Sequence, residues 1–244
     1  SSSGRHVAWN GTVWVAVGQG TNSIAYSSDG INWTGAINNT SIFSDKGLGV
    51  AWNGTVWVAV GAGTNTIAYS YDGINWTGVG KSIFSIAGRG VAWNGTMWVA
   101  VGNGTNTMAY SYDGINWTGT DTDVISGVMD VAWNGTVWVA VGFGTNTIVY
   151  SYDGINWTEV INSKSIFGSF GNGVAWNGTV WVAVGIGTNS IAYSYDGINW
   201  TGIVNSIFSD GYSVAWNGTV WIAVGQGTNS IAYSNDGINW TGIG

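Results

Sequence analysis

Six copies of one short motif carry half of the acidic side chains in this chain. The motif is Ser-x-Asp-Gly-x-x-Trp, and its carboxylate could act as a general acid or base or bind a hard cation. A cation site needs several oxygen ligands, but each motif supplies one carboxylate with no second acid beside it. The pattern therefore favours a structural role, in which each carboxylate accepts backbone N–H groups and fixes a turn. The six aspartates are Asp29, Asp72, Asp113, Asp153, Asp196 and Asp236.

The other acidic residues predict no catalytic pair. Glycosidases use two carboxylates roughly 5–10 Å apart, and Asp121 and Asp123 lie in a polar T-D-T-D stretch that is typical of a solvated loop. The single histidine, His6, has no nucleophile near it in the sequence, and there is no cysteine. The V-G-x-G-T-N segments lack the helix and lysine of a phosphate-binding loop. We therefore expect no catalytic residue, no cofactor and no metal. The remaining acids of this group are Asp45, Asp130, Glu159 and Asp210.

Composition excludes some partners. The chain carries five Lys and Arg and a formal net charge of −7, which argues against binding to a phosphate backbone. No apolar run is long enough to cross a bilayer, so we expect neither a nucleic-acid partner nor membrane insertion.

A repeat of about 40 residues organises the whole chain. The segment V-A-W-N-G-T recurs six times, and a period of this length indicates a propeller or a solenoid. A parallel β-helix would need shorter coils, which makes it the less favoured of the two. The repeats begin near Val7, Val50, Val91, Val131, Val174 and Val214.

Each repeat has the pattern of four short strands. In the third repeat, β-branched and aromatic runs at 91–94, 97–102, 107–111 and 117–119 are separated by N-G-T, G-T-N and D-G-I-N. Asn-Gly and Asp-Gly are strong hairpin signals, and no helical period is visible. The sequence predicts an all-β, six-bladed β-propeller over residues 1–244, a single domain with four antiparallel strands per blade. The three tryptophans of each repeat are expected to pack between blades.

The repeated motif resembles the Asp-box of BNR-type β-propellers, which is also found in sialidases. It has one residue fewer between Asp and Gly than the usual pattern, and the near-identity of the repeats is similar to propellers of giant viruses and some bacteria. The resemblance implies that the Asp-box is a fold element away from the substrate face. It also implies a sialidase site with three arginines and a Tyr–Glu pair. Because the chain has only Arg5, Arg89 and the single glutamate Glu159, that site cannot be assembled, and we expect no enzyme activity.

Differences between the repeats gather in two places. One is residue x of V-G-x-G, and the other is the linker from the fourth strand to the next repeat. In a four-stranded blade both emerge at the same end, where loops on a rigid scaffold commonly carry binding residues. Drift in tolerant loops and selection for binding both fit this variation. The candidate binding residues are Gln19, Ala62, Asn103, Phe143, Ile186 and Gln226 at x, with Met129, Phe170 and Tyr212 in the linkers.

The favoured function is a non-enzymatic binding or scaffold module whose ligand is a protein or a glycan. The alternative is a multivalent carbohydrate-binding lectin, for which the invariant G-T-N turn (Thr105 and Asn106 in the third repeat) is the candidate repeated group. Aligning the two ends of the sequence places both within a linker, so we expect each blade to form from one repeat without strand exchange, and the chain to be a closed monomer.

Overall fold

The computed structural model describes residues 3–120, 123–203 and 207–244. It divides into two compact units, unit 1 (Ser1–Asp121) and unit 2 (Thr122–Gly244), each containing three repeats. The single domain expected from the sequence stays a prediction.

Unit 1 consists of three four-stranded antiparallel groups and one short helix. Its elements are β1 (Ser3–Trp9), β2 (Trp14–Gln19), β3 (Ile24–Ser27), β4 (Thr34–Gly35), α1 (Asn39–Ile42), β5 (Lys46–Trp52), β6 (Trp57–Ala62), β7 (Ile67–Ser70), β8 (Thr77–Gly80), β9 (Ala87–Trp93), β10 (Trp98–Asn103), β11 (Met108–Ser111) and β12 (Thr118–Thr120).

Unit 2 repeats this plan. Its elements are β13 (Gly127–Trp133), β14 (Trp138–Phe143), β15 (Ile148–Ser151), β16 (Thr158–Glu159), α2 (Ser163–Ile166), β17 (Phe170–Trp176), β18 (Trp181–Ile186), β19 (Ile191–Ser194), β20 (Thr201–Gly202), β21 (Asp210–Trp216), β22 (Trp221–Gln226), β23 (Ile231–Ser234) and β24 (Thr241–Ile243).

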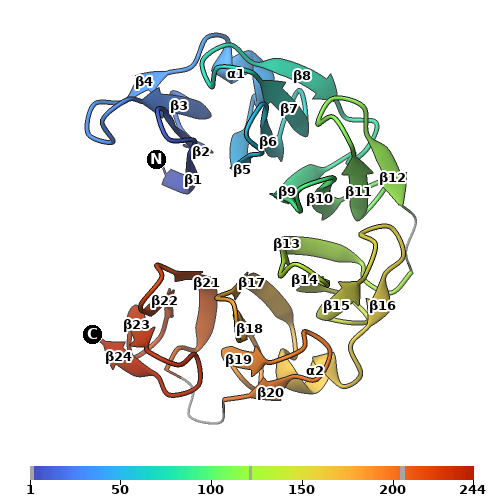
Figure 1. Cartoon of the computed structure of the whole chain (residues 1–244), viewed down its shortest axis with the longest axis vertical. Coiled ribbons are helices and arrows are strands. Elements are labelled where there is room, and N and C mark those ends of the chain that lie inside the picture. Colours follow the sequence, from blue (N-terminus) through green and yellow to red (C-terminus); the bar gives the residue numbers. More distant parts are fainter. Residues whose placement is uncertain (1–2, 121–122, 204–206) are drawn as a thin grey trace. The chain divides into compact units, whose positions relative to one another are not determined.

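Within each repeat the strands pair in sequence order, as β1-β2-β3-β4 does in the first repeat. In unit 1 the first strands β1, β5 and β9 lie on one side, and the fourth strands β4, β8 and β12 lie on the other (Figure 1). Backbone bridges join neighbouring groups within each unit, Ile37 with Asn75 and Ala62 with Ala87 in unit 1 and Ile186 with Asp210 in unit 2. The all-β class and the repeated four-stranded sheets are therefore as the sequence predicts.

The side chains of the second and third strands explain how neighbouring sheets pack. One surface of each sheet, the valine face, carries valines and an isoleucine such as Val15, Val17 and Ile24. The opposite surface, the tryptophan face, carries a tryptophan and two alanines such as Trp57, Ala59 and Ala68. Strand alternation produces the two faces, and the valine face of one sheet packs on the tryptophan face of the next within each unit.

The linkers add to this core. The phenylalanine of each S-I-F segment is buried in the cluster between two sheets of its unit. This burial gives the linkers a packing role as well as a connecting one. The four phenylalanines are Phe43, Phe84, Phe167 and Phe208.

Two features of the linkers differ from the sequence prediction. Four-residue helices, α1 and α2, occur where no helical pattern was visible, because a single turn is too short to show a period. In addition, each first strand begins several residues before V-A-W-N. In the third repeat Ala87 pairs with Asn103 at the end of β10, so the last part of the linker belongs to the sheet.

Candidate binding face

A β-bulge interrupts the first strand of all six repeats. In the third repeat Gly90 pairs with Val101 and Gly88 pairs with Gly102, which leaves Arg89 outside the ladder. A bulge commonly redirects the side chain of its extra residue. A Cβ on Gly102 would overlap the carbonyl oxygen of Ala87, so glycine permits the close approach of the two strands. The six bulge residues are Arg5, Leu48, Arg89, Met129, Asn172 and Tyr212.

The bulge residues and the x residues of V-G-x-G lie at the same end of each sheet. Each x residue ends a second strand and pairs with the first residue of the first strand, as Gln19 pairs with Ser3 and Ile186 with Phe170. We call the x residues, the bulge residues and Phe170 the variable face, considered separately in each unit. Met129, Phe170 and Tyr212 were expected in loops but lie in β13, β17 and β21.

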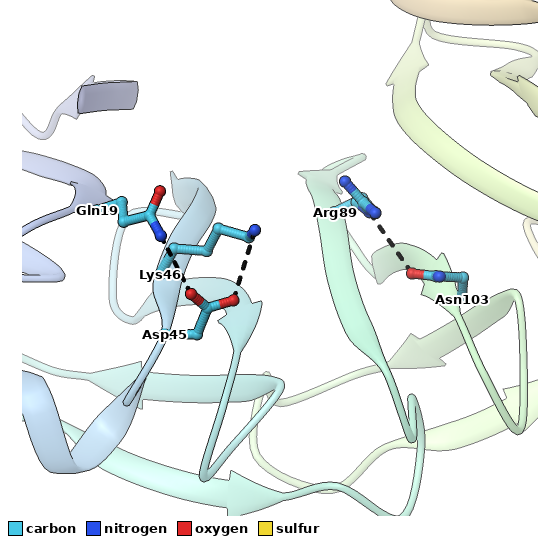
Figure 2. Close-up of polar contacts among 5 residues, drawn as sticks. All are labelled: Gln19, Asp45, Lys46, Arg89 and Asn103. Atoms are coloured by element: carbon cyan, nitrogen blue, oxygen red, sulfur yellow. Dashed lines mark hydrogen bonds and ion pairs between the residues drawn. The ribbon is translucent and has the colours of Figure 1, made fainter. Parts of the chain in front are cut away.

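In unit 1 the variable face is polar and basic (Figure 2). The carboxylate of Asp45 accepts a hydrogen bond from Gln19 Nε2 (3.2 Å) and forms an ion pair with Lys46 Nζ (3.4 Å). Arg89 Nε donates to Asn103 Oδ1 over 3.5 Å. Partial burial lowers the pKa of Arg89, and the nearby charge of Arg5 lowers it further.

In unit 2 the variable face is aromatic. The rings of Phe143 and Phe170, from β14 and β17, lie 5.3 Å apart between neighbouring sheets. Tyr212 donates its hydroxyl to Gln226 Oε1 over 2.6 Å. In both units the variable residues therefore contact one another, but with different chemistry.

Sequence reasoning missed part of this face. It named Met129 and Tyr212 but not Arg5, Leu48, Arg89 or Asn172, which occupy the same bulge position. The bulge position could have been found from the sequence, because the residue two positions before each V-A-W-N differs in nearly every repeat. In contrast, Ala62 is buried, with 7% of its surface exposed, although it was named as a candidate binding residue.

The invariant G-T-N turn holds the linker in place. Asn106 Nδ2 donates to the carbonyl oxygen of Ile83 (2.8 Å), and Asn65 Nδ2 donates to that of Ile42 over the same distance. Asn146, Asn189 and Asn229 make the equivalent bond in unit 2. A lectin would need a polar side chain free to bind sugar at this position in every repeat. The side-chain amide nitrogen of this asparagine is already bonded to the linker, so the turn is a poor candidate for that role.

The Asp-box turns lie at the opposite end of the sheets. Asp113 Oδ1 accepts the N–H groups of Ile115 and Asn116 at 2.8 Å, and Oδ2 accepts Asn116 Nδ2 at 2.7 Å. Gly114 has φ +77°, a left-handed conformation that favours glycine. Trp117 Nε1 closes the turn by donating to the Gly114 carbonyl (3.1 Å). The other five turns have the same bonds.

These bonds keep the carboxylates ionised. Partial burial by itself would raise the pKa of Asp113, but the backbone and side-chain hydrogen bonds from Asn116 outweigh it. With further bonds from Ile115 and Ser111, they lower the pKa to about 2. The same causes lower the pKa of Asp72, Asp153 and Asp196 to about 2.

Two titratable residues occupy the position just before V-A-W-N. The carboxylate of Asp130 accepts the N–H groups of Val131 (2.9 Å) and of Val174 in the next repeat (3.0 Å). Burial raises the pKa of Asp130 to about 6, although both hydrogen bonds oppose this rise. His6 is exposed and hydrogen-bonds to the backbone of Val50 in the next repeat. Both side chains connect neighbouring first strands.

The other acids do not converge on one site. Asp123 is exposed, and Glu159 Oε2 accepts a hydrogen bond from Asn146 Nδ2 (3.1 Å). Asp121 lies outside the described residues. Among residues 3–120, 123–203 and 207–244, no group of three or more His, Asp or Glu side chains could hold a metal ion. Both helices of this described part are four residues long, too short to cross a membrane.

Neither a protein-family model nor a curated protein sequence matches this chain. Solved structures do. A catalytically inactive variant of virginiamycin B lyase from Staphylococcus aureus, solved with quinupristin, superposes with a TM-score of 0.80 at 11% identity, over 99% of this chain and 84% of that one. The computationally designed Ika8 protein superposes with a TM-score of 0.63 at 13% identity, over 97% of this chain and 72% of its own.

The GH74 enzyme of Niastella koreensis superposes with a TM-score of 0.73 at 19% identity, over 100% of this chain. This chain spans 37% of the length of that enzyme. At such identities the likeness concerns the fold, and two of the neighbours are named as enzymes. The repeated four-stranded sheets and these superpositions together identify the fold as β-propeller-like.

Proposed function

We propose that this chain is a non-enzymatic binding or scaffold module that engages its ligand through the variable face. One observation carries the proposal: the residues that differ most between repeats occupy bulges and strand ends at one end of the sheets. The invariant Asp-box and N-G-T turns lie at the other end. Variation concentrated at one end of a rigid scaffold is typical of proteins that bind through that end.

The chemistry of the face favours a macromolecular partner over a small substrate. Phe170 and Tyr212 expose 38% and 46% of their surface in unit 2, and the bulge residues Arg5 and Arg89 supply positive charge in unit 1. Exposed aromatic rings and arginine are enriched at protein interfaces. The runner-up, a multivalent lectin with repeated sites on this face, is less favoured because Asn106 is committed to the linker.

The proposal excludes catalysis by the named acids. Asp45 is paired with Lys46, Asp130 binds two backbone N–H groups, and Glu159 bonds to Asn146. Purified protein is expected to release no fluorophore from aryl sialosides or aryl glycosides at any pH from about 4 to 8. Turnover that disappears when one of these acids is replaced would show that the chain is an enzyme.

The binding function is tested with the immobilised full chain and extracts of its source. A partner captured by the wild-type chain is purified and titrated against Arg89→Ala, Phe170→Ala and Tyr212→Ala. At least one of these variants should weaken binding tenfold or more, which is about 1.4 kcal/mol. Ile31→Ser, an exposed apolar change in the Asp-box turn of the first repeat at the opposite end, is the control and should leave binding unchanged. A partner that responds only to the control variant would contradict this use of the variable face.

We further propose that the six repeats close into one six-bladed ring without strand exchange. The first and last sheets each take all four strands from a single repeat. Val7 and Trp9 on the tryptophan face of the first sheet are exposed, as are Val224 and Ile231 on the valine face of the last. Their equivalents Val50 and Val184 are buried between sheets, so the two exposed faces have the complementary composition of the interfaces seen within each unit.

A further inference from the structure

Four of the six Asp-box turns carry an exposed tyrosine that no packing requirement explains. These are Tyr71, Tyr112, Tyr152 and Tyr195, and each exposes between 65% and 67% of its surface. These four are the most exposed aromatic side chains of the described residues, whereas the tryptophans of the second strands, such as Trp57 and Trp98, are fully buried. A large aromatic residue repeated at this exposure usually marks a contact surface.

Each exposed tyrosine is held by a second one. Tyr69 and Tyr71 meet edge to face with ring centroids 6.0 Å apart, and the pairs at Tyr112, Tyr152 and Tyr195 have separations of 5.8–5.9 Å. Edge-to-face packing orients the outer ring while leaving much of it open to solvent. The same arrangement therefore recurs four times, twice in each unit.

Polar groups surround the ring pair. In the second repeat Tyr69, Tyr71, Asp72, Asn75 and Thr77 line a surface hollow of about 210 Å³. Oδ1 of Asp72 accepts three hydrogen bonds from its own turn, whereas Oδ2 accepts only one, from Asn75 Nδ2. That oxygen keeps a lone pair for a ligand hydroxyl, and the exposed Thr77 lines the same hollow.

We propose that these four turns are equivalent, weak binding sites for neutral sugar units of a polysaccharide. The C–H face of a pyranose ring stacks on an oriented aromatic ring, while its hydroxyl groups bond to carboxylate, amide and hydroxyl groups at the edge. Tyr71, Asp72, Asn75 and Thr77 supply these groups together. The proposal is independent of the function proposed for the variable face, which lies at the other end of the sheets.

The first and last repeats supply an internal control. They keep the inner tyrosine, the aspartate, the asparagine and the threonine of the turn, but Ser28 and Asn235 replace the exposed tyrosine. Tyr26 pairs with Thr34, as Tyr69 does with Thr77, so the backbone frame is the same. Only the outer ring separates the four proposed sites from the two turns that lack it.

Several equivalent sites act together on a polymer. Individual sugar contacts are weak, but linked sites raise overall affinity by about 10²–10⁴-fold when geometry allows joint engagement. Removing two sites should therefore lower affinity for a polysaccharide at least about tenfold. Affinity for a monosaccharide should fall only in proportion to the number of sites.

The test is affinity electrophoresis of the full chain in gels containing a soluble β-glucan, a galactomannan or an arabinoxylan. The wild-type chain should be retarded by at least one of them. A variant with Tyr71→Ser, Tyr112→Ser, Tyr152→Ser and Tyr195→Ser, which copies the first repeat, should migrate as in a gel without polysaccharide. Ser28→Tyr together with Asn235→Tyr should increase retardation.

Two controls distinguish loss of sugar binding from loss of folding and from general surface effects. Thermal unfolding of the fourfold variant should match that of the wild type within a few degrees. Ile86→Ser, at an exposed linker residue outside both proposed binding surfaces, should leave retardation unchanged. Absence of retardation of the wild-type chain in all three gels would overturn the proposal. So would a folded fourfold variant retarded as strongly as the wild type, or binding of an oligoproline peptide in place of sugar that the fourfold variant loses.

Discussion

At the scale of single residues, identical positions in different repeats carry out different physical tasks. Gly49, Gly90 and Gly173 precede V-A-W-N in three repeats, whereas Asp130 holds the same position in the fourth. Its carboxylate joins β13 to β17 through the N–H of Val174. The link is made at the cost of burying an ionisable group, because burial raises the pKa of Asp130 to about 6.

This difference predicts a pH dependence of stability. An aspartate whose folded pKa is raised contributes stability that is fully present below its unfolded pKa, near 3.9, and that is lost as pH rises through about 6. Asp130→Gly should therefore flatten the change in unfolding free energy between about pH 3 and 7.5, by roughly 2–3 kcal/mol. Urea unfolding at several pH values measures it. An unchanged pH profile in the variant would contradict the raised pKa.

At the scale of elements, side-chain hydrogen bonds define the turns. Each Asp-box carboxylate binds two backbone N–H groups, and the asparagine of each N-G-T turn does the same, as Asn94 Oδ1 does for Thr96 and Met97. The asparagine of G-T-N instead fixes the linker. The turns fix the register of the strands they join, so these strands can be as short as two to four residues.

The Asp-box predicts a measurable loss when its carboxylate is removed. Asp113→Ala leaves the N–H groups of Ile115 and Asn116 without their acceptor, and it should lower the unfolding free energy by roughly 1 kcal/mol at pH 7. Because the pKa of Asp113 is lowered to about 2, this difference should persist above about pH 4 and disappear as pH falls through 2. Asp123→Ala, at an exposed aspartate, is the control and should change stability by less than about 0.5 kcal/mol.

At the scale of the whole molecule, repetition makes the interfaces between neighbouring sheets within each unit copies of one design. Valine faces pack on tryptophan faces within both units. Within a sheet, the tryptophans of the first and second strands also contact each other, as Trp93 and Trp98 do with ring centroids 5.2 Å apart. Near-identical interfaces allow any valine face to fit any tryptophan face. The same property would let chains associate with one another if the first and last sheets did not pair.

Ring closure gives the last prediction. If Ile231 on the valine face of the last sheet packs on the first sheet, Ile231→Lys should bury an unpaired charge and lower stability by roughly 3 kcal/mol. Asn235→Lys, at an exposed turn position, should change it by less than about 0.5 kcal/mol. Urea unfolding gives the free energies, and light scattering should show a monomer. Equal, small effects of the two substitutions, or association of the wild-type chain, would count against a closed monomeric ring.

The sequence by itself determined the strands, the turns and their repetition. Runs of β-branched and aromatic residues and the Asn-Gly and Asp-Gly dipeptides between them act locally, so each repeat of about 40 residues specifies four strands without reference to the others. The same local chemistry makes the role of Asp113 readable, because its partners lie within three residues.

The tertiary structure decided what depends on pairing between distant segments. The bulges at Arg89 and Tyr212 form only when the linker pairs with the end of a second strand. The linker sequence has no alternating pattern that marks which residue will lie outside the ladder. The Phe143–Phe170 contact joins two repeats, and the commitment of Asn106 to the Ile83 carbonyl crosses 23 residues. Such contacts depend on strand register and on which sheets are neighbours, so residues far apart in the sequence can meet.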